Sequence, residues 1–214
     1  MPEMTEQEAQ DFVEQVLDQG ERNAIEVALA SENPWKHENF NDLTKTNLVT
    51  AKVKIKDFHF ERVSRKCCYC RRSLEDASIE TDREHIIPKG KKKSLSYDIF
   101  NLSLACKRCN MTYKGEKVDH IVDVDTIEAD CRNPDRYLIP HPNIHSYEDH
   151  LIRVSVQYGA QQFTSYRRIT PQGQFLYDFV RLDQLCVDEL DIAQGGKKVD
   201  EVVAQILEIP IDGA

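Results

Sequence analysis

The sequence contains two short cysteine motifs, Cys67-Cys68-Tyr69-Cys70 and Cys106-Lys107-Arg108-Cys109, and these predict the centre of the fold. Each motif has two cysteines separated by two residues, the spacing at which a tight turn presents two thiolates to one metal ion. Two such turns supply the four thiolates of a tetrahedral zinc site, and the basic neighbours offset their negative charge. We therefore expect a structural zinc ion bound by Cys67, Cys70, Cys106 and Cys109.

The zinc ion would stabilise a segment that is too small to hold together by apolar burial alone. Structural zinc contributes about 10–16 kcal/mol in finger peptides, as much as the net stability of about 5–15 kcal/mol of a whole domain. Four unliganded buried cysteines are the disfavoured alternative. The 35 residues between the motifs exceed the spacing of a zinc ribbon, which indicates an insertion. Cys131 and Cys186 are isolated, and we expect both to be small apolar core residues.

The insertion carries Glu84-His85-Ile86-Ile87-Pro88-Lys89, and Asn101-Leu-Ser-Leu-Ala-Cys-Lys-Arg-Cys-Asn110 follows it. Each of these motifs alone is weak evidence for a catalytic site, since a Glu-His pair is commonly a surface ion pair and an Asn commonly caps a helix. Their order, together with the cysteine motifs and Lys114-Gly115, resembles the HNH endonuclease family, the zinc-bearing branch of the ββα-metal nucleases. The resemblance covers about residues 67–117. More loosely, the layout resembles the HNH nucleases of bacterial phage-defence systems such as Septu.

The resemblance implies an α+β fold with a ββα-metal core. A β-hairpin would carry His85, a following helix would carry Asn110, and the four-cysteine zinc site would hold both. We expect three regions: an acidic helical region with a linker over residues 1–47, the HNH nuclease core over 48–118, and a mixed α/β region over 119–214 that packs on the core or on a partner.

The resemblance also implies roles for the motif residues. His85 is the expected general base, which takes a proton from the attacking water. Glu84 and Asn110 would hold one Mg²⁺ or Mn²⁺ ion, because carboxylate and amide oxygens suit a hard cation. Asn101 would orient the loop of His85. Substrate phosphates would be bound by Lys89, Lys91, Lys92, Lys93, Arg108 and Lys114.

Two departures from the family pattern bear on these roles. Glu84 stands where many members have Asp, and its longer side chain could shift the ion. Three residues rather than two separate Asn110 from Lys114, which leaves the role of Lys114 open. Asp82 could compete for the ion, although we expect its side chain to point away along the strand.

The N-terminal flank has helical and alternating patterns. Thr5-Glu6-Gln7-Glu8 matches a capping box, which predicts helices over residues 5–30 with a break at Gly20. The polar segment 35–47 is typical of a linker or long loop. Residues 51–56 alternate between apolar residues and lysine, which predicts a strand, although the spacing of Phe58, Arg62 and Lys66 leaves a helix as the alternative.

The C-terminal flank predicts a strand over residues 152–158, a turn at 170–173, a helix over about 175–190 and a last short helix over 199–207. A proline-bearing loop and its continuation contain His141, His145 and His150. These histidines could form a second metal or phosphate site. A loop packed on the core is the favoured interpretation, because their spacing repeats no zinc pattern.

The charge distribution predicts a polyanion as substrate. Residues 45–117 contain 18 Lys and Arg but 9 Asp and Glu, although the whole chain has a net charge of −9. A basic block with acidic flanks suits nucleic acid, and a merely solvated surface is the alternative. The acidic helices expected at residues 1–30 and 176–208 could contact a partner protein or shield the basic site.

The composition of the chain predicts the class of protein and its location. The chain is 40% hydrophobic and 30% charged, and it contains no apolar stretch of membrane-spanning length and no apolar signal segment at its start. We expect a soluble cytoplasmic endonuclease that hydrolyses DNA in a bacterial defence or restriction system, with a partner protein supplying specificity and no membrane contact. RNA stays open as a substrate. The alternative is a non-catalytic, zinc-stabilised nucleic-acid-binding module or adaptor.

Overall fold

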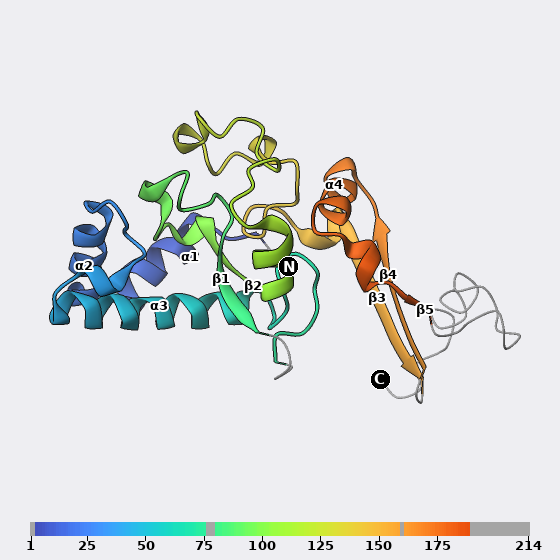
Figure 1. The fold of residues 1–214 in the computed structure, drawn as a ribbon, viewed down its shortest axis with the longest axis horizontal. Coiled ribbons are helices and arrows are strands. Elements are labelled where there is room, and N and C mark those ends of the chain that lie inside the picture. Colours follow the sequence, from blue (N-terminus) through green and yellow to red (C-terminus); the bar gives the residue numbers. More distant parts are fainter. Residues whose placement is uncertain (1–2, 76–79, 159–160, 189–214) are drawn as a thin grey trace, which may run out of the picture.

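The computed structural model describes residues 3–75, 80–158 and 161–188. It has an elongated shape with three parts (Figure 1). Helices α1 to α3 lie at one end, the hairpin of β1 and β2 lies in the middle, and β3 to β5 with α4 lie at the other end. The mixture of helices and small antiparallel sheets confirms the α+β class.

Two capping boxes start the N-terminal helices. Helix α1 (Glu6–Asp11) begins at Thr5, as the sequence predicts, and continues as the π-helix η1 (Phe12–Val16). Helix α2 (Gln19–Leu29) begins at a second capping box, in which Asp18 and Glu21 satisfy each other's backbone N–H groups. Gly20 therefore lies in the first turn of α2, and the expected helix end at this glycine is wrong.

The long helix α3 (Asp42–Arg62) replaces the strand expected over residues 51–56 and begins inside the expected linker. Asn41 caps it by accepting a hydrogen bond from the backbone of Thr44. Its buried residues include Leu48, Ala51 and Ile55, which follow the helical period. Val53 is 49% exposed, although it belongs to the same alternating apolar set as Ala51 and Ile55. Tertiary packing against α2 therefore selects the helix, which was the alternative interpretation.

Strands β1 (Thr81–His85) and β2 (Leu102–Cys106) form an antiparallel hairpin in which Thr81 faces Cys106 and His85 faces Leu102. The π-helix η5 (Arg108–Lys114) follows β2 directly. At its end the N–H of Gly115 donates to the carbonyl of Asn110, five residues earlier, at 2.7 Å. A strand, a strand and a helix thus follow one another as expected, and the wider π turn accommodates the extra residue between Asn110 and Lys114.

The C-terminal part is a three-stranded antiparallel sheet with strand order β3-β4-β5, covered by one helix. Its elements are β3 (Leu151–Tyr158), β4 (Gln161–Arg168), α4 (Pro171–Phe179) and β5 (Val187–Asp188). The expected strand over 152–158 is confirmed, whereas the helix expected to reach residue 190 ends at Phe179. Gly173 permits close approach, because a Cβ there would lie 1.9 Å from the carbonyl oxygen of His150. The helix expected over 199–207 lies outside the described residues.

Short 3₁₀ helices connect these elements: η2 (His37–Asn39), η3 (Lys93–Leu95), η4 (Ile99–Asn101), η6 (Ile127–Ala129), η7 (Pro134–Arg136), η8 (Tyr147–Asp149) and η9 (Leu182–Leu185). None of the described helices is both long and apolar enough to cross a membrane.

The cysteine motifs lie in the core that joins the middle of the molecule to its C-terminal part. The hydroxyls of Tyr147 and Tyr166 donate to the carbonyls of Tyr69 and Cys70 at 2.9 and 2.7 Å, so the C-terminal part fixes the first motif. The isolated cysteines differ from the expectation of core positions. Cys186 is exposed and Cys131 is half-buried, because the loops that carry them run along the surface.

Candidate metal centre and basic pocket

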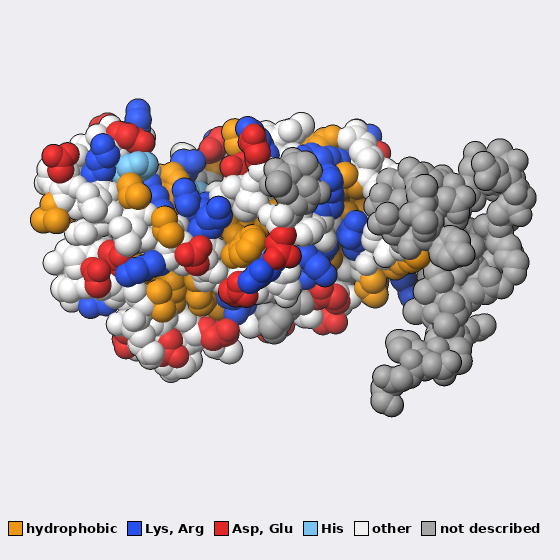
Figure 2. Space-filling model, turned by 90° about the horizontal axis from the view of Figure 1, so that it is seen from below, with side chains coloured by type: hydrophobic (Ala, Val, Ile, Leu, Met, Phe, Trp, Pro, Cys, Tyr) orange, Lys and Arg blue, Asp and Glu red, His pale blue; other side chains and the backbone are white. Residues whose placement is uncertain are grey.

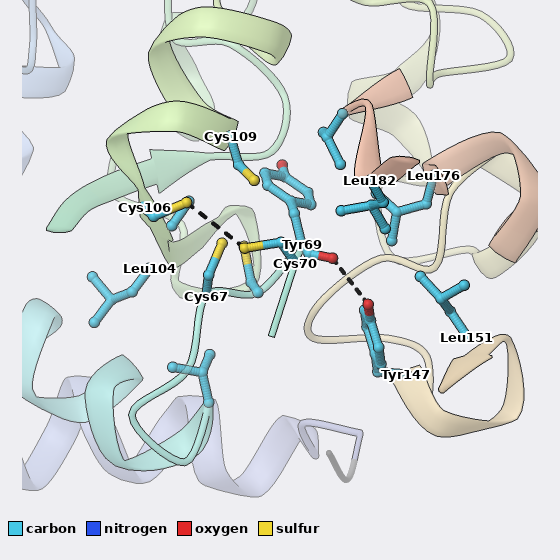
Figure 3. Close-up of a cluster of buried hydrophobic side chains, with 14 of the residues drawn as sticks. Cys67, Tyr69, Cys70, Leu104, Cys106, Cys109, Tyr147, Leu151, Leu176 and Leu182 are labelled. Atoms are coloured by element: carbon cyan, nitrogen blue, oxygen red, sulfur yellow. Dashed lines mark hydrogen bonds between the residues drawn. The ribbon is translucent and has the colours of Figure 1, made fainter. Parts of the chain in front are cut away.

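The four motif cysteines converge on one point. The sulfur atoms of Cys67, Cys70, Cys106 and Cys109 all lie within 4.8 Å of one another, and all four residues are buried (Figure 3). The Sγ atoms of Cys70 and Cys106 are 3.8 Å apart. With Zn–S bonds of about 2.3 Å, the edge of a tetrahedron is about 3.8 Å. The donor set therefore fits zinc in kind, number and spacing.

Local backbone geometry builds the first cysteine turn. The N–H of Arg71 donates to the carbonyl of Cys67 at 2.9 Å, and the N–H of Cys67 donates to the carbonyl of Arg72 at 2.8 Å. Arg71 adopts a left-handed conformation with φ 57°. This conformation turns the chain back after Cys70, which aligns both sulfur atoms of the turn.

The two faces of β1 contact different parts of the molecule. Asp82 and Glu84 face η5, where the amide nitrogen of Asn110 donates to Asp82 at 3.2 Å and Lys114 lies 2.7 Å from Glu84. His85 lies on the opposite face, with its ring 4.5 Å from the Trp35 ring. The expectation that Asp82 points away is wrong, because it shares a face with Glu84 and contacts Asn110.

Glu84 is completely buried and already has a cation beside it. Its Oε1 atom accepts a hydrogen bond from the Tyr69 hydroxyl at 3.1 Å and contacts the Lys114 ammonium at 2.7 Å. Burial raises the pKa of Glu84, and Lys114 opposes that rise. The ammonium also donates to the carbonyl of His85 at 2.8 Å. Lys114 thereby links Glu84 to the end of β1.

The oxygen donors expected to hold a divalent ion fit that ion in kind. The Oε2 atom of Glu84 is buried and has no hydrogen-bond partner among the described residues. Within the described part of the chain, the Asn110 side chain forms its one hydrogen bond through its nitrogen, which leaves the amide oxygen for a cation. A divalent ion bound there would share the Glu84 carboxylate with Lys114.

His85 is held as a neutral imidazole with a defined tautomer. Its Nε2 atom lies 3.1 Å from the carbonyl oxygen of Ser96, and a carbonyl can only accept, so Nε2 carries the proton. Burial lowers the pKa of His85 to about 3, and the charge of Lys89 adds to the effect. The Nδ1 atom has no partner among the described residues and is not fully enclosed. It is therefore the nitrogen that can accept a proton.

Asn101 ties the chain after His85 into a fixed loop. Its amide nitrogen donates to the carbonyls of Ile87 and Leu95 at 3.0 and 3.1 Å, and its oxygen accepts from the N–H of Ile87 at 2.7 Å. The side chain is 3% exposed, so these bonds are shielded from water. These contacts are those of a positioning residue.

The six basic residues expected to bind phosphates fall into two groups. Lys89, Lys91 and Lys93 are exposed and have no carboxylate partner within the described residues. The other three are held by contacts inside the protein, which differs from the expectation. Lys92 pairs with Glu128 at 3.0 Å, Arg108 donates to the carbonyls of Val180 and Arg181, and Lys114 is 2% exposed.

A pocket of about 910 Å³ opens on the His85 side of β1. Its lining includes Trp35 and Lys52 from the N-terminal part, Arg83 from β1, and Lys89 and Ser96 from the loop after β1. The sequence patterns did not identify Trp35, Lys52 and Arg83 as residues of a binding pocket. Lys52 stands among the buried positions of helix α3, and a buried lysine would have indicated a binding site. The interpretation of residues 51–56 as a strand did not reveal this.

The histidines of the long connection between η5 and β3 make structural contacts within the described residues. His141 and His145 each accept a hydrogen bond from a loop N–H at 3.2 and 2.9 Å, and His150 contacts the Thr170 hydroxyl at 2.8 Å. In the part of the chain that the structure describes, the four cysteines are the only group of three or more His, Cys, Asp or Glu residues placed to share a metal ion.

Comparison with known proteins agrees with the central region. The model of the HNH endonuclease family matches residues 67–116, which carry the four cysteines, β1, β2 and η5. No curated protein and no solved structure matches the chain. The middle of the molecule is therefore a domain of the HNH endonuclease type, and the N-terminal helices and the C-terminal sheet lie outside the match.

Proposed function

We propose that the protein is a metal-dependent HNH endonuclease that hydrolyses phosphodiester bonds of DNA. The observation that carries the proposal is the pairing of a neutral His85, whose Nδ1 can accept a proton, with a pocket whose lysines and arginine form no ion pair with any described residue. A general base beside an anion-binding surface is what phosphodiester hydrolysis requires. RNA is the alternative substrate, because phosphate contacts carry little sequence information.

In this mechanism His85 removes a proton from the attacking water through Nδ1. The Ser96 carbonyl fixes the tautomer, and Asn101 fixes the loop between them. Exposed lysines, above all Lys89, hold the phosphate that is attacked. A bound phosphate would also reduce the repulsion that Lys89 exerts on a protonated imidazole, which opposes the lowering of the His85 pKa by burial.

We assign the two metal roles to separate places. Zinc at the four cysteines is structural. Mg²⁺ or Mn²⁺ would be held by Glu84 and Asn110, on the face of β1 opposite His85, and would stabilise negative charge only on a phosphate that reaches that face around the end of the strand. Glu84 offers the unpartnered Oε2, and Asn110 offers its amide oxygen. Lys114 contacts the other carboxylate oxygen, Oε1, and balances its negative charge.

The biological setting is also a proposal. We place the protein in the cytoplasm, in a bacterial defence or restriction system, with a partner protein that supplies specificity. The support is the HNH match at the centre and the acidic composition of the flanks, which suits contact with another protein or shielding of the basic site.

One observation favours a second candidate function, a non-catalytic nucleic-acid-binding module. The Lys114 ammonium lies 2.7 Å from Glu84 and occupies one of the oxygen atoms that a divalent ion would use. In a binding module that ion pair would be permanent, and the zinc site and basic pocket would suffice.

A plasmid-cleavage assay with Mg²⁺ or Mn²⁺ separates the candidates. We expect the wild type to cleave and His85→Ala to lose at least about a hundredfold in rate, the range for loss of a general base. Retained DNA binding and unchanged circular dichroism in His85→Ala show that the loss is chemical. Absence of cleavage by the zinc-loaded wild type in either metal, with DNA binding intact, favours the binding module.

A further inference from the structure

We infer that the pocket beside His85 binds the phosphodiester backbone of a nucleic-acid strand through residues of the N-terminal part as well as of the HNH domain. This inference rests on the proposed function and names the substrate contacts of the same site. We call it the cationic pocket, defined by its six basic lining residues, Lys36, Lys52, Arg83, Lys89, Lys91 and Lys93.

These six cations have no carboxylate partner among the residues that the structure describes. Ion pairs are common elsewhere in the described residues. Lys92, for example, pairs with Glu128, whereas the adjacent Lys91 and Lys93 form no ion pair there. The face shown in Figure 2 likewise has Lys and Arg interspersed with Asp and Glu. Three carboxylates, Glu32, Glu38 and Glu116, also line the pocket, so cations exceed them two to one. An anion from outside would supply the missing countercharge.

Lys52 is the strongest part of the argument, because its charge is almost completely buried. The side chain is 4% exposed, and its ammonium contacts the carbonyl of Trp35 at 2.5 Å and Nδ1 of His37 at 3.1 Å. It also lies 4.5 Å from the centre of the Trp35 ring. Burial, together with the nearby charge of Arg83, lowers the pKa of Lys52 to about 8. A phosphate in the pocket would stabilise this ammonium directly.

Arg83 adds a donor group of suitable shape on the neighbouring wall. Its guanidinium donates to the backbone carbonyl of Lys52 at 3.3 Å and lies 6.0 Å from the Trp35 ring. Among the residues that the structure describes, that carbonyl is the only hydrogen-bond partner of its five N–H donors, and a guanidinium can bind two phosphate oxygens at once. Arg83 and Lys52 therefore form a preformed pair of cations in the pocket that Lys89 also lines.

The pocket is adjacent to the proposed reaction centre. The rings of Trp35 and His85 are 4.5 Å apart, and Ser96, whose carbonyl holds His85, lines the pocket. A volume of about 910 Å³ lies within the range of small-ligand sites and can accommodate nucleotide units. A strand bound there would present a phosphodiester to His85.

Trp35 provides a direct measurement, because it is the only tryptophan of the chain. We would titrate the zinc-loaded full chain with a short DNA oligonucleotide in buffer without Mg²⁺ or Mn²⁺ and record Trp35 fluorescence, with inorganic phosphate as a second probe. We expect a saturable change with DNA at far lower concentration than with phosphate. Lys52→Met should weaken DNA binding about tenfold or more and reduce its salt slope by about one.

Lys45→Met is the matched control, since Lys45 is exposed on the same helix and does not line the pocket. It should bind DNA within about twofold of the wild type, as expected for a charge that makes no phosphate contact. Arg83→Gln serves as the second test if Lys52→Met does not fold. The inference is overturned if DNA binds, as measured by anisotropy, without changing Trp35 fluorescence, or if both pocket variants bind like the wild type. The two proposals can fail separately. If the wild type binds DNA but never cleaves it, and Lys52→Met weakens that binding, the inference stands and the endonuclease proposal is rejected.

Discussion

Glu84 shows how one residue can serve both stability and chemistry. Its carboxylate is inaccessible to water and is neutralised by Lys114 and a hydrogen bond from Tyr69. Because a buried charge without a partner is costly, the fold depends on this contact whatever ion also binds there. The Oε1 atom of Glu84 makes the structural contacts, and the unpartnered Oε2 atom is the one that could bind a metal ion.

We predict that Lys114→Met lowers the free energy of unfolding by about 3–5 kcal/mol, because it leaves the buried Glu84 carboxylate without its cation. Glu84→Gln combined with Lys114→Met should recover a large part of that loss. Urea denaturation of the zinc-loaded protein measures both effects. Lys107→Met is the control, since Lys107 pairs with Glu80 at the surface, where an ion pair contributes less than about 1 kcal/mol. Equal effects of the two lysine variants would contradict the prediction.

Sequence patterns identified the four cysteines that cluster in the structure, because ligand spacing is a local property. The same patterns could not tell which residue contacts Asn110. That choice depends on the face of β1 and on the helical form of η5, which bring Asp82 to Asn110 and Lys114 to Glu84. The contribution of Trp35 was equally hidden, because it lies far from the motif in sequence and meets His85 only after folding.

At the scale of elements, α3 shows why alternation alone misleads. Residues 51–56 alternate perfectly between apolar residues and lysine, yet the helix buries Ala51, Lys52 and Ile55 and exposes Val53. The packing of α3 against α2 and β2 decides the outcome, and a single short window contains no information about those partners. Capping residues were the better local signal, since Asn41 marks the start of α3.

The two cysteine turns should be the elements most sensitive to metal. We predict that a strong chelator under mildly denaturing conditions removes zinc and unfolds the region 67–114, because four buried thiolates lose the ion that neutralises them. Circular dichroism, protease resistance and zinc content measure the result. Mild EDTA treatment that removes only a weakly held divalent ion should stop cleavage reversibly and leave the fold intact.

Serine variants provide the controls for this prediction. Cys70→Ser should lose zinc and become protease-sensitive, whereas Cys186→Ser should behave like the wild type, because Cys186 is exposed and outside the cluster. Unchanged circular dichroism and protease resistance after complete zinc removal would show that the cysteine turns are held by packing alone.

At the scale of the whole molecule, the flanks complete the central domain. The guanidinium of Arg108 donates to carbonyls of Val180 and Arg181, and Met4 donates its N–H to the carbonyl of Asn143 at 2.8 Å. The core of the molecule also holds buried histidines. Both His59 and His120 are fully buried, and burial lowers the pKa of each to about 3. The folded protein therefore keeps them neutral over the physiological range.

We predict that stability falls as the pH drops below about 6.5, the pKa of histidine in an unfolded chain. The unfolded state then binds protons that His59, His120 and the other buried histidines (His85, His141 and His145) do not bind in the folded state. Acidification therefore favours unfolding, by up to about 1.4 kcal/mol per pH unit for each such group. Above that pH their contribution is fully present. The raised pKa of Glu84 acts in the opposite direction, so the total slope alone does not isolate the histidines. His59→Leu does: it removes one of five buried histidines whose pKa burial lowers (His59, His85, His120, His141 and His145), so the pH dependence of its urea midpoint should be shallower by about a fifth, at constant zinc content between pH 7.5 and 5.5. An identical slope in the variant and the wild type would mean that His59 is protonated in the folded state.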